Sequence, residues 1–163
     1  MKAKSSARFR AASSGNPVRQ NGAPNMFQQD YLMRLIWQFV EAMRRTVEKD
    51  DDPDAKAASV EDAIANALEM DASVVLGLAP ESFAGILSVS GTDPHVVEYL
   101  VRGMALESYY LEQAGKQQAT QLRFDQACAL AAAYGIEAPA VGEIPVMNDF
   151  DEMLEADGIT GEE

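Results

Sequence analysis

Four acidic residues in the middle of the first half of the chain have the spacing of calcium ligands. Asp50, Asp52 and Asp54 alternate along the chain, and Glu61 follows further on. A twelve-residue calcium-binding loop takes ligands from positions one, three, five and twelve, because carboxylate oxygens suit a hard cation. In the segment 50–61 these four residues stand at those positions, so the spacing predicts a calcium site.

The same segment departs from the EF-hand pattern. Ala55 stands where the loop needs glycine, and the left-handed conformation costs alanine roughly 1–2 kcal/mol. Pro53 stiffens the segment, and the chain offers no second loop of this kind for pairing. A degenerate EF-hand-like loop at 50–61 is therefore the alternative interpretation, beside a chance match in an acidic linker.

Few other residues offer catalytic or metal-binding chemistry. The chain has one histidine, His95, at the start of a predicted helix, where a solvent-facing side chain is common. The one cysteine, Cys128, lies in an alanine-rich helix, where an inert thiol is expected. Phosphate-binding loops, dinucleotide fingerprints and Cys-x-x-Cys pairs are absent from the sequence. The sequence thus assigns no catalytic residue and favours a non-catalytic protein, while an enzyme with a carboxylate-based site stays open.

Positive and negative charges are segregated along the chain. Residues 1–25 carry a charge of +5. Because the net charge of the chain is −13, the remaining residues carry −18. A body this acidic repels the phosphates of nucleic acids and anionic lipids, so we expect no binding to nucleic acid or membrane. The single cysteine and the lack of a long apolar run predict a cytoplasmic protein.

The N-terminal residues 1–25 are predicted to be a disordered basic tail, because they are rich in Ser, Ala and Gly. Their Arg- and Ser-rich, acid-free composition also matches an organelle transit peptide. Helical periodicity begins abruptly after Met26. We therefore favour Met26 as the native start, with residues 1–25 upstream of it.

Apolar residues at three- and four-residue spacing predict an all-α domain over residues 26–135. The predicted helices cover residues 26–49, 59–68, 80–91, 94–115 and 116–134, with a helical turn at 74–78. Short connections between them favour an antiparallel helical bundle of five to six helices.

The C-terminal segment 136–163 is acidic and is expected to be largely flexible. No Lys or Arg follows Arg123, and prolines and glycines interrupt the segment. An amphipathic turn inside it contains Val146, Met147, Phe150, Met153 and Leu154. Such a turn could dock on its own body or on a partner, so a docked segment and a loose tail both stay open.

The start of the predicted domain resembles a family of small uncharacterised bacterial helical proteins. Residues 26–36 read Met-Phe-Gln-Gln-Asp-Tyr-Leu-Met-Arg-Leu-Ile, and members of that family tend to begin with Met-Phe-x-x-Asp-Tyr-(Ile/Leu)-Met-Arg. The resemblance implies a helical protein of unknown activity. It identifies Asp30, Tyr31 and Arg34 as residues of the family motif, without assigning them a role. Asp30 and Arg34 also have the spacing of an ordinary helical ion pair.

A second resemblance covers residues 94–134, which are similar to a tetratricopeptide hairpin in length. The positions that carry it are Leu106, Tyr110, Thr120, Phe124 and Ala127. The Leu-Gly pair typical of the first helix is missing, because Glu107 follows Leu106, and an array needs about three repeats. The resemblance implies a short tetratricopeptide-like helix-hairpin array as the second form of the all-α fold.

The leading functional hypothesis is a protein-interaction module or scaffold. Tyr99, Tyr109 and Tyr110 share one predicted helix with Arg102, and Tyr and Arg are enriched at interfaces. These residues predict a surface for a protein or peptide of unknown identity, although the tyrosines could instead belong to the core. A homodimer through the face from Tyr31 to Met43 is a further option, and a calcium-responsive protein is the alternative from another class.

Overall fold

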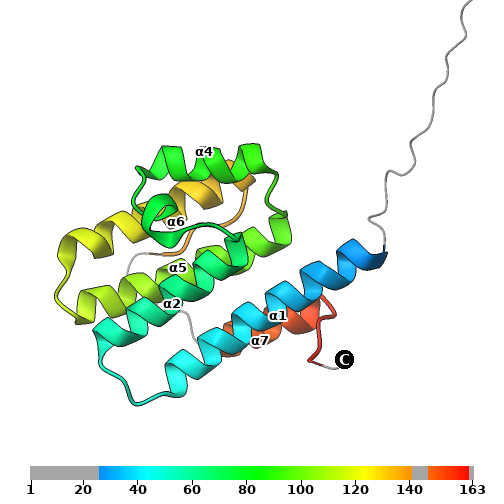
Figure 1. The fold of residues 1–163 in the computed structure, drawn as a ribbon, viewed down its shortest axis with the longest axis horizontal. Helices are drawn as coiled ribbons and strands as arrows, with labels where there is room; N and C mark the ends of the chain where they lie inside the picture. The colour runs from blue at the N-terminus through cyan, green and yellow to red at the C-terminus, as the bar shows by residue number, and fades with distance from the viewer. Residues whose placement is uncertain (1–25, 141–146, 162–163) are drawn as a thin grey trace, which may run out of the picture. The chain divides into compact units, whose positions relative to one another are not determined.

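A computed structural model of the protein describes residues 26–140 and 147–161, and this part of the chain is all-helical, as predicted (Figure 1). The helices are α1 (Met26–Glu48), α2 (Pro53–Leu68), α3 (Ala72–Val75), α4 (Pro80–Ser90), α5 (Pro94–Gln113), α6 (Gln117–Tyr134) and α7 (Met147–Ala156). The described residues thus form seven helices where five to six were predicted. The predictions for residues 1–25 lie outside the described residues. None of the helices in the described ranges is long and apolar enough to cross a membrane.

Asp-Pro pairs start two of the helices. The Oδ1 atom of Asp52 accepts the N–H of Ala55 at 2.8 Å, and Pro53 follows as the first residue of α2. Asp93 and Pro94 repeat this arrangement at the start of α5. An aspartate cap and a proline at the first helical position both favour a helix start. The predicted start of the second helix at residue 59 was therefore wrong, because the linker itself begins the helix.

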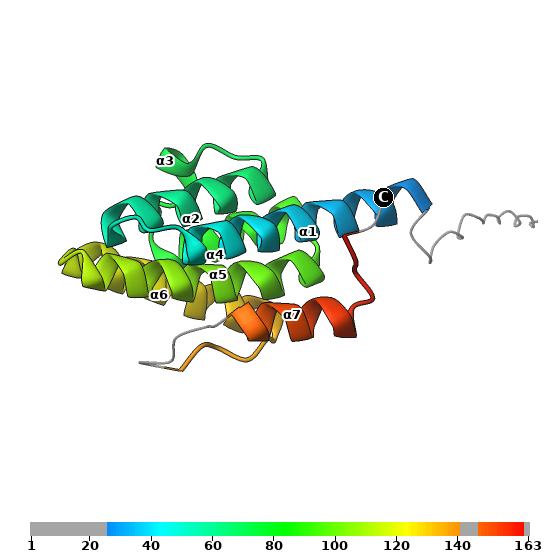
Figure 2. The same ribbon diagram turned by 90° about the horizontal axis from the view of Figure 1, so that it is seen from below.

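The centre of the fold is the hairpin of α5 and α6. The helix α2 packs along α5, and α4 packs along α6 (Figures 1 and 2). Residues on nearly every side of α5 are buried, including Val97, Leu100 and Met104. On α6, the Tyr134 hydroxyl donates to the carbonyl oxygens of Leu87 and Thr92, at 3.1 and 2.9 Å. This contact ties the end of α6 to the end of α4.

The helix α1 spans two compact units of the chain, which divide between Arg34 and Leu35. In the first unit, the described side chains run from Gln28 to Arg34 and are mostly exposed. In the second unit, α1 continues as an amphipathic helix with one buried face. That face consists of Ile36, Phe39, Val40 and Met43. Their three- and four-residue spacing puts them on one side of the helix.

The C-terminal segment is folded where it is described. In and after α7, Phe150, Leu154 and Ile159 are buried. Gly158 has a φ of 70°, which is the left-handed conformation that ends helices, and the Ile159 N–H bonds to the Leu154 carbonyl oxygen at 2.9 Å. The sequence left a docked segment and a loose tail open, and in this described part three apolar side chains occupy buried positions. Residues 141–146 lie outside the described part of the chain.

Candidate functional site

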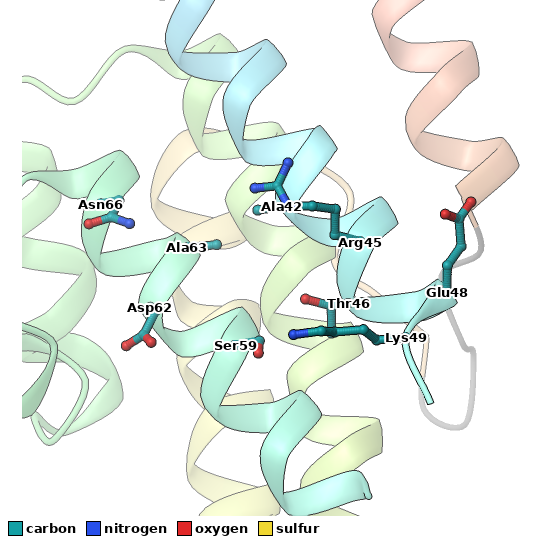
Figure 3. A pocket seen from close by; sticks show the side chains of 9 residues that line it. All are labelled: Ala42, Arg45, Thr46, Glu48, Lys49, Ser59, Asp62, Ala63 and Asn66. Carbon is teal, nitrogen blue, oxygen red and sulfur yellow. The ribbon is translucent and has the colours of Figure 1, made fainter. Parts of the chain in front are cut away.

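A groove runs between the second half of α1 and the helix α2 (Figure 3). It has a volume of about 510 Å³. Its lining residues are Ala42, Arg45, Thr46, Glu48 and Lys49 of α1 and the following loop, and Ser59, Asp62, Ala63 and Asn66 of α2. Most of them recur at three- or four-residue spacing, so each helix presents one face to the groove.

A second hollow of about 270 Å³ adjoins this groove and shares four lining residues with it, Ala42, Arg45, Ala63 and Asn66. Leu35 and Phe39 add apolar surface to the second hollow. From Leu35 to Lys49 the α1 wall is about 21 Å long, at a rise of about 1.5 Å per residue. The two hollows together, called the α1–α2 groove below, offer an apolar end and a polar end.

Two basic side chains, Arg45 and Lys49, line the polar end of the groove. Figure 3 shows Arg45 and Lys49 extending from α1 toward α2. Within the described chain Arg45 makes no ion pair, and the carboxylate nearest to Lys49 is Asp51, at 3.9 Å. Asp62 lies on the α2 wall, and Glu48 stands at the rim and points away from α2. An acidic side chain of a ligand could therefore pair with Arg45 or Lys49 without breaking a strong internal contact.

Thr46 is the buried polar residue of the groove. It is 5% exposed, and its hydroxyl has no hydrogen-bond partner among the residues that the structure describes. Leaving a buried hydroxyl without a partner costs about 1–3 kcal/mol. A ligand that brings a polar atom to Thr46 would recover part of this free energy.

A second polar cluster is buried between α2, α5 and α6. The Arg123 Nε donates to the Glu107 Oε1 at 2.9 Å, and its Nη2 donates to the Glu61 Oε2 at 3.0 Å. Its Nη1 donates to the Leu76 carbonyl oxygen at 2.9 Å and to the side-chain oxygen of Gln126. One guanidinium thus connects three helices and the end of α3.

The carboxyl group of Glu107 has an unusual pKa. Burial raises this pKa to about 7, although the neighbouring Arg123 lowers it, and the charge of Glu61 adds to the rise. Glu107 is only 1% exposed, so a substrate in solution would not reach it. We therefore interpret the cluster as a structural element that joins helices.

The four predicted calcium ligands do not come together. Asp52 caps α2, Asp54 pairs with the lysine before α6, and Glu61 pairs with the buried arginine of the cluster. Asp50 lies before α2, and most of the expected loop is helical. Among the described residues, no three His, Cys, Asp or Glu side chains are grouped to hold a metal ion. The calcium site stays a prediction without support from the geometry.

The predicted aromatic surface is mostly inside the fold. Tyr99 and Tyr110 are buried, at 1% and 6% exposure, because other segments cover most sides of α5. Tyr109 is half-buried and accepts a hydrogen bond from the Gln113 side chain at 2.8 Å. Arg102 is half-buried beside α7. These four residues therefore do not form one exposed binding face.

The other residues singled out by sequence are also spread over the fold. Asp30, Tyr31 and Arg34 are exposed on α1, and Asp30 and Arg34 form no ion pair with each other. His95 is exposed at the start of α5. Cys128 is half-buried, and burial raises the pKa of its thiol, which disfavours the reactive thiolate.

The α1–α2 groove was not predicted from the sequence. Two small residues, Ala42 of α1 and Ala63 of α2, are among its lining residues (Figure 3). A small residue within an apolar stripe, together with Thr46 at a buried position of that stripe, is the signal that could have indicated a hollow. No protein-family model, no curated protein and no solved structure matches the chain. The two family resemblances therefore stay predictions.

Proposed function

We propose that the chain is a non-catalytic protein-interaction module that binds a helical segment of a partner protein in the α1–α2 groove. The observation that carries this proposal is the groove itself, which combines apolar surface with Arg45 and the Thr46 hydroxyl, neither of which has a side-chain partner among the residues that the structure describes. Its length matches about four turns of helix. A helix that lies in a groove between two helices is a recurring mode of peptide recognition.

The groove also indicates which kind of segment would fit. Apolar side chains of the partner would lie near Leu35 and Phe39, and the Ala42 and Ala63 positions leave room for larger groups. A carboxylate further along the same segment would pair with Arg45 or Lys49. As a scaffold for this groove we propose a short tetratricopeptide-like array or antiparallel bundle, supported by the α5–α6 hairpin with α2 and α4 on its flanks.

The proposal can be tested by filling the groove. The variant Ala42→Trp places a large side chain in it, and Arg45→Glu reverses the charge of an exposed residue on its wall. The matched control is Ala133→Trp, at an exposed position of α6 far along the chain from the groove. We expect proteins captured from a host lysate by the wild type and by the control to be lost with both groove variants. Equal capture by all four proteins would refute the groove as the binding site.

A further inference from the structure

The segment from α7 to Gly161 packs against α1 and α5 through side-chain and backbone contacts, as a bound peptide would. Its contacts include Trp37 and Arg44 of α1 and Tyr99 of α5, and Arg102 of α5 lines a hollow beside it; we call these four residues the α7 face (Figure 2). The backbone of Gly161 lies against the Trp37 indole ring. This face lies on other residues than those that line the α1–α2 groove.

Three apolar side chains anchor the segment. Phe150, Leu154 and Ile159 are all buried, and the first two lie one helical turn apart. The rest of the segment is strongly acidic and includes Asp149, Asp151, Glu152, Glu155 and Asp157, without a single Lys or Arg. The segment is therefore an acidic amphipathic helix with a short extension.

Two side chains of the face, Arg44 and Tyr99, orient the segment by charge-assisted hydrogen bonds. The Arg44 Nη2 donates to the Asp151 Oδ1 at 2.7 Å, and its Nη1 approaches the other carboxylate oxygen at 3.5 Å. The Tyr99 hydroxyl donates to the Asp157 Oδ2 at 2.7 Å. Burial and the charge of Asp157 raise the pKa of Tyr99, so its hydroxyl keeps the proton that it donates. Hydrogen bonds to ionised groups are stronger than neutral ones and give direction to the contact.

We propose that the α7 face is a recognition site for acidic amphipathic helices of partner proteins, and that α7 is a resident ligand which such a helix displaces. The contact has buried apolar anchors and a partly exposed ion pair at its edge, which is the arrangement of an apolar core and a polar rim in protein interfaces. The side chains of Arg44 and Asp151 are 29% and 45% exposed. The Arg123–Glu107 pair of the helical core, by contrast, is almost fully buried.

The length of α7 supports this interpretation. A helix of ten residues is too short to be stable alone in water, so its helicity depends on the face beneath it. The net negative charge of the protein does not prevent an acidic ligand from binding. At physiological salt, charges are screened beyond about 8 Å, so the groups at the face set the local field: Arg44 and Arg102, together with Glu41, which pairs with Arg44 at 3.1 Å, and Glu98.

A displaceable segment competes with an added helix for the same face. A covalently linked segment acts at an effective concentration on the order of millimolar. A variant that weakens the contact from the α7 side frees the face and should increase the affinity for an added helix. A variant that damages the face should decrease this affinity. Substitutions in α7 and substitutions in the α7 face should therefore change the affinity for an added helix in opposite directions.

The experiment uses the full chain and a fluorescent peptide of residues 147–161, with binding measured by fluorescence anisotropy. We expect Asp151→Lys to bind the peptide at least about tenfold more tightly than the wild type, because its own α7 loses a hydrogen bond to a charged partner. Phe150→Ala, which removes an apolar anchor, should act in the same direction. The matched control is Glu155→Lys, which makes the same charge change at an exposed position of α7 and should bind like the wild type.

The complementary variant is Arg44→Glu, which should lose binding of the natural peptide and recover it with a peptide that carries Asp151→Lys. Ala42→Trp should leave peptide binding unchanged, so failure of the groove proposal and failure of this one are distinguishable. The proposal is overturned if Asp151→Lys and Phe150→Ala bind the peptide no better than the wild type at up to about 1 mM. It is also overturned if the peptide binds Arg44→Glu as tightly as it binds Asp151→Lys.

Discussion

Replacing Glu107 with glutamine removes one negative charge from the buried cluster around Arg123 and keeps the shape of the side chain. In the folded protein, burial raises the pKa of Glu107 from 4.5 to about 7. Between these two pH values the folded state holds a proton that the unfolded state has lost. The resulting stability is present below about pH 4.5 and is lost as the pH rises through about 7.

The size of the effect follows from the same two pKa values. One pKa unit corresponds to about 1.4 kcal/mol, so the wild type should lose about 2–3 kcal/mol of unfolding free energy from Glu107 between pH 5 and pH 8. Glu107→Gln has no proton to lose at this position. We therefore expect the stability of the variant, relative to the wild type, to increase by up to that amount over the same range. Arg123 keeps Glu61 as its ionised partner, at 3.0 Å.

The assay is urea unfolding of both proteins at several pH values from 5 to 8. The isoelectric point of the sequence is about 4.4, and the protein would tend to precipitate near that pH. The assay range of pH 5 to 8 lies above it. The single tryptophan, Trp37, reports unfolding by fluorescence, and the difference between the two proteins cancels the titration of the other carboxylates. The reasoning is refuted if Glu107→Gln is less stable than the wild type at pH 8 and the deficit shrinks toward pH 5. That result would mean that Arg123 holds Glu107 ionised.

Three further substitutions test how single residues support the fold, each by urea unfolding at neutral pH. Gly103→Ala should cost about 1–3 kcal/mol, because the new Cβ would lie 2.5 Å from the Phe39 ring; full stability would show that the ring moves aside easily. Asp52→Ala should cost about 1 kcal/mol through loss of the α2 cap, whereas the neighbouring control Asp51→Ala should have little effect; equal losses would argue against the cap. Glu69→Gly should stabilise the protein by about 0.5–1 kcal/mol, because Glu69 has a φ of 57° at the end of α2; a loss of stability would contradict the strain.

The helices were largely predictable because their signals are local. Apolar residues at three- and four-residue spacing, and glycines such as Gly135 after the last turn, indicate helices from a few neighbouring residues. The predicted start of α2 at residue 59 was wrong, because Pro53 was interpreted only as part of a linker that separates two helices. An aspartate before a proline can also cap the next helix, and the local sequence does not distinguish the two roles.

The candidate sites depend on contacts between distant parts of the chain. Nothing near Glu61 in the sequence indicates that Arg123 lies 3.0 Å away, so its carboxylate was assigned to a calcium loop. Tyr99 looked like an interface residue because its type is common at interfaces. In the folded protein its hydroxyl contacts Asp157, which is far away in the sequence.

The sequence by itself determined that the protein is all-α and where most helices end, because helix periodicity and caps are properties of adjacent residues. It also showed the segregation of charge along the chain. Only the tertiary structure decided which faces meet. It paired α1 with α2 around the groove, placed α7 on Arg44 and Tyr99, and buried Glu107 beside Arg123. Each of these features depends on packing between segments, and the free energy of packing is not encoded in any local pattern.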